Sequence, residues 1–183
     1  ASRSPRRSTL MRELGIPFRV VETGHTDETY PSHLTGEEIA RHLAEHKSDA
    51  YKVPLSEKQI LLTADTIVWQ DGKELGKPAH REEALAMILS LSGGTHQVYT
   101  GVCLRSGSNR TSFIAVTDVT FSTLEQDEVI TYVDKYKPYD KAGAYGIQEW
   151  IGYIAVERIN GSYFNVMGLP VQKVYSELKA FIR

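Results

Sequence analysis

Residues 59–69 read QILLTADTIVW, an apolar run with one carboxylate, Asp65, in its interior. The content of isoleucine, leucine, valine and tryptophan predicts a fully buried strand over 59–63 that continues through 64–66 to 67–69. A carboxylate in such a strand costs free energy unless it is paired, hydrogen-bonded or bound to a metal. Asp65 is therefore either half of a buried structural ion pair or a functional acid, and the pattern alone leaves both open.

Caps and turns outside this strand predict the other elements. The pairs Asp71-Gly72 and Asn160-Gly161 are typical of tight hairpin turns, and Ser4 before Pro5 is typical of a helix start. We expect helices at 5–14, 36–50, 82–91, 124–135 and 171–182, and strands at 16–21, 59–69, 97–104, 111–121, 153–159 and 162–166. This order predicts one α/β domain over residues 1–183, with a mixed sheet and flanking helices rather than a doubly wound parallel sheet.

The composition narrows the class of protein. The 183 residues are 41% hydrophobic and 24% charged, as in an ordinary soluble globular protein. The net charge of -2 argues against a nucleic-acid partner, and no apolar run is long enough to span a membrane. No signal peptide is visible in a sequence that begins without an initiator methionine. The single cysteine, Cys103, is expected in the core and has no internal disulfide partner, which predicts the reducing cytoplasm.

Basic side chains recur at the first helix start and in two glycine-containing loops. They are Arg3, Arg6, Arg7, Lys77 and Lys141. Arginines in a first helical turn oppose the helix dipole, so they either form a solvated surface or, with the helix start, hold an anion such as phosphate. Taken together, the five cations suit a polyphosphate. Because no P-loop and no G-x-G-x-x-G motif occurs, a phosphate pocket would be of another kind.

A second short pattern points to a different chemistry. Residues 42–46, HLAEH, match the inverted zinc-protease pattern H-x-x-E-H and place His42 and His46 on one face of a helix. The pattern is short, and no clear third ligand follows it. We therefore favour a solvated helix face over a zinc site.

Six stretches, taken in order, resemble a known family. They are ASRSPRR (1–7), ADTIV (64–68), GKP (76–78), LSGGTHQVYTGV (91–102), DKAGAYGIQ (140–148) and NGSYFNVMGLP (160–170). In this order they resemble the Maf family of nucleoside triphosphate pyrophosphatases, over essentially the whole chain. The Asp-Thr pair at 65–66 and the intact 140–148 loop look like the branch that hydrolyses dTTP and UTP. This family usually has a strand directly before the first motif, so that strand is expected to be absent or incomplete before Ala1.

The resemblance implies a fold and a reaction. The fold would have two lobes around a deep cleft, similar to the inosine triphosphate pyrophosphatases. The reaction would convert dTTP or UTP, and also modified pyrimidine nucleotides that fit the same pocket, to the monophosphate and pyrophosphate. It would need Mg²⁺ or Mn²⁺, in a cytoplasmic homodimer that binds neither nucleic acid nor a membrane. A non-catalytic nucleotide-binding regulator of septum formation and a phosphatase that releases inorganic phosphate remain as alternatives.

The resemblance also implies roles for individual residues. Asp65 would be the general base that acts on the attacking water. Substrate specificity would be set by Arg6, Thr66 and Gln148. Phosphate would be bound by Ser4, Arg7, Lys47 and Lys77. Glu28 and Asp65 would hold the metal.

Overall fold

The computed structural model describes residues 4–24 and 26–182. The helices are α1 (Pro5–Glu13), α2 (Gly36–Ala50), α3 (Arg81–Leu91), α4 (Gln126–Tyr136), α5 (Trp150–Ala155), α6 (Tyr163–Val166) and α7 (Val171–Phe181), with a 3-10 turn η1 (Ala142–Ala144). The strands are β1 (Leu61–Gln70), β2 (Lys73–Leu75), β3 (Thr95–Arg105), β4 (Arg110–Phe121) and β5 (Val156–Asn160). No helix in the described ranges is both long and apolar enough to cross a membrane.

The strands form one five-stranded sheet in the order β2-β1-β3-β4-β5. The expected α/β class with flanking helices is confirmed. A mixed sheet was expected, but every pairing among the described strands is antiparallel. Short turns join β1 to β2 and β3 to β4, and such turns connect only antiparallel strands, which accounts for two of the four pairings.

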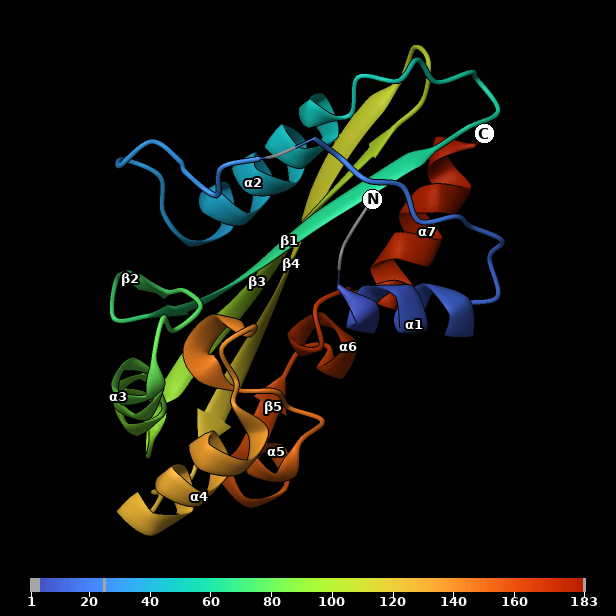
Figure 1. Cartoon of the computed structure of the whole chain (residues 1–183). Helices are drawn as coiled ribbons and strands as arrows, with labels where there is room; N and C mark the ends of the chain where they lie inside the picture. The colour runs from blue at the N-terminus through green and yellow to red at the C-terminus, as the bar shows by residue number, and fades with distance from the viewer. Residues whose placement is uncertain (1–3, 25, 183) are drawn as a thin grey trace.

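Helices cover both faces of the sheet (Figure 1). Successive residues of a strand point to opposite faces. On one face Ile67 of β1 packs with Ile39 and Leu43 of α2. On the other face Ala64 packs in a cluster with Leu10 of α1 and with residues of α7. A third cluster lies at the other end of the sheet, where α3, α4 and α5 gather.

The strand predicted at 59–69 is confirmed as β1, which runs without interruption through Asp65. Asp65 lies opposite Gly101 of β3. A side-chain carbon at Gly101 would fall 2.1 Å from the backbone oxygen of Ala40 in α2, well inside van der Waals contact. The glycine therefore lets α2 lie directly on the sheet beside Asp65.

The segment 16–21 is not a strand, contrary to the prediction. None of the described strands pairs with it, and Phe18 and Val20 are exposed. Alternating apolar residues favour a strand only where a neighbouring strand can accept the backbone hydrogen bonds. This segment therefore has the side-chain pattern of a strand without the ladder.

The expected hairpin at Asn160-Gly161 is also wrong. Residues 150–155 form α5, and the residues after the turn form the short helix α6. The side chain of Ser162 accepts a hydrogen bond from the backbone N–H of Asn165 and caps α6. The buried Asn165 side chain donates to the backbone oxygen of Val98 at 2.9 Å, which fixes α6 against β3. A polar cap and a buried amide thus override the strand-like pattern.

Candidate active site

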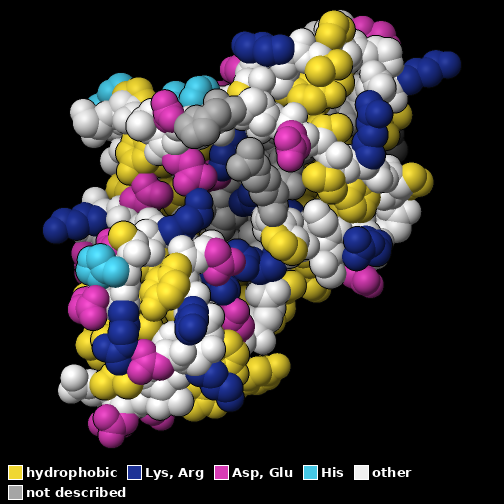
Figure 2. All heavy atoms as spheres, viewed as in Figure 1, with side chains coloured by type: hydrophobic (Ala, Val, Ile, Leu, Met, Phe, Trp, Pro, Cys, Tyr) yellow, Lys and Arg dark blue, Asp and Glu magenta, His cyan; other side chains and the backbone are white. Residues whose placement is uncertain are grey.

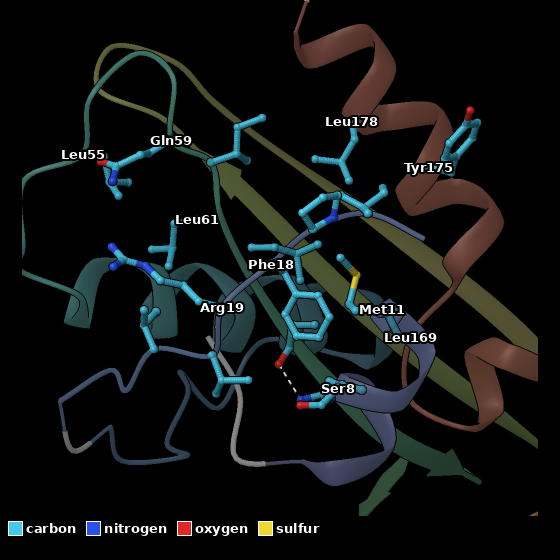
Figure 3. Close-up of a pocket in the computed structure, with 18 of the residues that line it drawn as sticks. Ser8, Met11, Phe18, Arg19, Leu55, Gln59, Leu61, Leu169, Tyr175 and Leu178 are labelled. Atoms are coloured by element: carbon cyan, nitrogen blue, oxygen red, sulfur yellow. Dashed lines mark hydrogen bonds between the residues drawn. The ribbon is translucent and has the colours of Figure 1, made fainter. Parts of the chain in front are cut away.

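Two cavities of similar size lie beside β1, and their linings separate them. One, of about 580 Å³, is mostly apolar and is lined by side chains such as Met11, Phe18, Leu169 and Leu178 (Figure 3). The other, of about 600 Å³, we call the charged cavity. Every residue to which the resemblance gives a role lines it: Ser4, Arg6, Arg7, Glu28, Lys47, Asp65, Thr66, Lys77 and Gln148. Arg3 lies outside the described residues.

The edge of β1 places two adjacent side chains in the charged cavity. Asp65 and Thr66 point to opposite faces of the sheet because they are neighbours in a strand. Both still line the cavity, since β1 pairs with β2 only over residues 68–70 and its edge is open at 65–66. Asp65 is only 7% exposed, so its carboxylate needs a partner.

That partner is Lys47 of α2. Its ammonium group contacts the Asp65 carboxylate and also lies 3.3 Å from Oε1 of Glu28. Lys77, which follows β2, donates to both Glu28 oxygens at 2.9 and 3.2 Å. Two lysines and two carboxylates therefore alternate along one wall, so Asp65 is half of a largely buried ion pair that faces a cavity.

The two lysines set the charge of Glu28. Partial burial by itself would raise the pKa of this carboxyl group, but the hydrogen bonds and charges of Lys77 and Lys47 hold it below its usual value. Glu28 is therefore ionised at neutral pH.

Arg7 joins α1 to β1 and to the segment that precedes α7. Its guanidinium group donates to the backbone oxygens of Gly168 and Ala64, each at 2.8 Å, and to Oγ1 of Thr66 at 2.9 Å. The Thr66 oxygen also lies 2.9 Å from Oγ1 of Thr100. Burial lowers the pKa of Arg7, but a guanidinium group remains charged in proteins. Arg7 thus brings a fixed positive charge to the cavity.

The start of α1 meets the 140–148 loop on the same side. Ser4 is the N-cap, as predicted, and accepts a hydrogen bond from the backbone N–H of Arg7. Arg6 Nη1 lies 3.1 Å from Oδ2 of Asp140, and Gln148 lines the cavity at the far end of this loop. Figure 2 shows Lys and Arg side chains gathered with Asp and Glu side chains around the middle of this face.

Glu74 of β2 also lines the cavity, and the sequence analysis missed it. It accepts a hydrogen bond from the Tyr30 hydroxyl, and its burial raises its pKa. The strand register that the Asp71-Gly72 turn imposes would have allowed Glu74 to be predicted from the sequence. In that register Glu74 lies opposite Trp69, and so shares a sheet face with Asp65.

The carboxylates fit a divalent cation that binds together with substrate. Lys47 contacts both Glu28 and Asp65, so an oxygen of each lies within reach of one cationic centre. Mg²⁺ usually binds through one or two carboxylates plus substrate phosphates. The described residues contain no cluster of three or more His, Cys, Asp or Glu side chains that could hold a metal by themselves. His42 and His46 stack on each other at 6.1 Å, and neither lines the charged cavity.

Known proteins resemble this chain over nearly its whole length. Proteins named dTTP/UTP pyrophosphatase are 55% identical in Bacteroides fragilis (98% of this chain, 93% of the relative), 52% in Parabacteroides distasonis (99% and 94%) and 47% in Flavobacterium johnsoniae (100% and 93%). The sequence model of the family described as Maf-like protein matches residues 1–181. By this match and these identities, the chain belongs to the Maf family.

Proposed function

We propose that this protein hydrolyses dTTP and UTP to the nucleoside monophosphate and pyrophosphate. The observation that supports this most directly is the charged cavity itself. Its cations, Arg6, Arg7, Lys47, Lys77 and Lys141, face carboxylates that could act on water. The relatives that are 55% and 52% identical over 98% and 99% of this chain are named dTTP/UTP pyrophosphatase, which supports the same reaction here.

The cations would bind the triphosphate and the departing pyrophosphate. Lys47 and Lys77 are held by Glu28 and Asp65, so a phosphate group that enters can replace a carboxylate as their partner. Arg7 is fixed by three hydrogen bonds and stabilises negative charge without rearranging. Arg6 and the capped start of α1 extend this positive surface, with Ser4 at its edge.

Asp65 would accept the proton of the attacking water. The position suits a general base because the carboxylate is held by a strand that pairs with β3 on one side and is open to the cavity on the other. Lys47 pairs with the carboxylate in this structure and would turn to phosphate when substrate binds. The Asp65 carboxylate would therefore be paired with Lys47 before substrate binds and would act as the base once substrate is bound.

Mg²⁺ or Mn²⁺ would be held by Glu28 and Asp65 together with phosphate oxygens. When bound, such an ion withdraws electron density from the phosphate and orients the water. Glu28 is ionised at neutral pH, as a metal ligand must be.

The nucleobase would be selected by Arg6, Thr66 and Gln148. Uracil and thymine present an N–H donor between two carbonyl acceptors, and the amide of Gln148 can both donate and accept. The Thr66 hydroxyl is already bonded to Arg7 and lies against Thr100, so Thr66 would act through its position and its methyl group. Modified pyrimidines with the same hydrogen-bonding edge would fit as well.

We also propose a compartment, a class of partner and an oligomeric state for the enzyme. Cys103 is buried and free, which suits the cytoplasm, and the net charge of -2 suits a small-molecule partner rather than nucleic acid. The resemblance supports a homodimer, which light scattering of the purified protein would test.

One experiment separates this function from its alternatives. The purified protein is incubated with a panel of nucleoside triphosphates and Mg²⁺ or Mn²⁺, and the products are resolved by chromatography. We expect monophosphate and pyrophosphate from dTTP and UTP. Inorganic phosphate as the first product would mean a phosphatase, and binding without any product would mean a regulator.

A further inference from the structure

The loop that contains Gln148 is tied to the rest of the protein by a continuous chain of polar contacts. Arg6 of α1 bonds Asp140 at 3.1 Å, and Asp140 bonds Lys141 at 2.7 Å. Lys141 bonds Glu149 at 3.1 Å, and the Glu149 carboxylate accepts a hydrogen bond from the Tyr132 hydroxyl. The chain ends in the loop backbone, where the N–H of Gly146 donates to the Tyr132 oxygen at 3.1 Å.

The middle of this chain is withdrawn from water. Tyr132 is fully buried in α4, and the side chains of Lys141 and Glu149 are 11% and 25% exposed. Buried groups lose much more than exposed ones when a partner is removed, because the remaining partner stays unpaired. This series of polar contacts therefore supports the loop from inside the protein, unlike an ion pair on the surface.

The loop backbone lies directly on this support. A side-chain carbon at Gly146 would fall 2.9 Å from Cδ of Glu149 and 3.0 Å from Cε of Lys141. Glu149 and Lys141 thus set the path of the chain two residues before Gln148. Lys141 is bonded to two carboxylates and so cross-links Asp140 to Glu149.

We propose that Glu149, with Tyr132 and Lys141, is a positioning residue for nucleobase selection, since it fixes the backbone that presents Gln148 to the charged cavity. The inference rests on the proposed function. A polar site rejects the wrong base only if its own groups are held in place and stay unpaired when that base binds. The same chain ends at Arg6, so the two sides of the base pocket are mechanically connected.

The test compares four variants on two substrates, UTP and CTP. Tyr132→Phe keeps the ring and removes the hydroxyl that joins Glu149 to Gly146, and Glu149→Ala removes the central carboxylate. Tyr136→Phe is the matched control. It lies on the same helix and its ring stacks on Tyr132 at 5.1 Å, but its hydroxyl has no hydrogen bond to the described part of the chain.

We expect the ratio of kcat/KM for UTP to that for CTP to fall about tenfold or more in Tyr132→Phe and Glu149→Ala. The loss should lie mainly in KM, because Asp65 and Lys47 are untouched. Glu149→Gln, which still accepts from Tyr132, should recover part of the ratio. Tyr136→Phe should match the wild type. An unchanged ratio in folded Tyr132→Phe would overturn the proposal, even if Glu149→Ala fails to fold.

A binding measurement separates this proposal from the proposed function. The affinity for a non-hydrolysable UTP analogue and the hydrogen exchange of residues 141–148 are measured for the same proteins. If the wild type releases no pyrophosphate from UTP, the proposed function fails. The positioning role still stands if Tyr132→Phe weakens binding and speeds exchange in the loop. It fails if neither changes.

Discussion

Lys47 and Asp65 are 18 residues apart in the chain and form an ion pair across the contact between α2 and β1, with side chains that are 18% and 11% exposed. Lys47 at the same time contacts Glu28, so a single ammonium group joins the two carboxylates of the proposed metal and water site. Lys47 is thus the shared partner of both carboxylates. A substitution of Lys47, Asp65 or Glu28 should therefore change activity according to the chemical role of the lost group, and not only according to its charge.

Asp65→Asn should lower kcat by about a hundredfold or more while the fold and nucleotide affinity persist. The amide has nearly the same shape and can still accept a hydrogen bond from Lys47, but it cannot take up a proton. Steady-state kinetics at saturating metal and substrate, together with binding of a non-hydrolysable analogue, measure the two effects. Wild-type turnover in this variant would show that Asp65 is not the base.

Removing a cation from the charged cavity should weaken both binding and catalysis. Arg6→Ala and Lys77→Ala should each cost about 2–4 kcal/mol in kcat/KM, because each loses a contact to developing phosphate charge. Arg110→Ala is the control, since Arg110 pairs with Asp49 away from the cavity and should change little. Equal and small effects at all three positions would mean that the cations are only a solvated surface.

Gln148→Ala should reduce the hydrolysis of dTTP and UTP far more than the residual activity on CTP. Cytosine reverses the hydrogen-bonding sense at two ring positions, so it gains little from the amide in the first place. A single methyl group is worth only about 1–3 kcal/mol in a pocket, and dTTP and UTP should therefore stay close to each other. Wild-type rates on ATP or GTP equal to that on UTP would contradict the assignment of the pocket.

The clearance at Gly101 gives a prediction for stability. Gly101→Ala should destabilise the protein by about 1–3 kcal/mol and lower kcat, because α2 must move away from β3 and take Lys47 with it. Gly76→Ala is the matched control for stability, since a side-chain carbon there meets nothing within 4 Å. Urea unfolding of the two variants measures the difference. Equal midpoints would show that the packing of α2 tolerates the shift.

His96 makes the fold sensitive to acid. It is fully buried, its Nε2 lies 2.8 Å from the Tyr145 hydroxyl, and burial lowers its pKa to about 4. The unfolded chain takes up this proton near pH 6.5, so the stability from neutral His96 is complete above that pH and is lost as the pH falls toward 4. The loss should reach about 3 kcal/mol.

The free energy of unfolding between pH 7.5 and pH 4 measures this effect. In His96→Gln the decline should be shallower than in the wild type, whatever the absolute stability. His33→Gln, at an exposed position, should keep the wild-type slope. If His96→Gln declines as steeply as the wild type, other groups are responsible for the acid sensitivity.

The sequence by itself determined the elements whose signals are local. The apolar run of β1 with Asp65 inside it and the serine cap and proline of α1 are confirmed because each depends on residues a few positions apart. The motifs also determined the family, and the residues they single out line one cavity.

Only the tertiary structure decided which side chains meet. The segment 16–21 has a strand pattern, but none of the described strands pairs with it, and α6 forms where Asn165 finds partners on β3. Arg6 and Asp140 are 134 residues apart, and their ion pair depends on the path of the whole chain. Lys141 is one of the basic residues that the sequence singles out, and only the structure shows that it joins Asp140 to Glu149. The charge of a side chain is known from the sequence, whereas its ion-pair partner depends on how the whole chain folds.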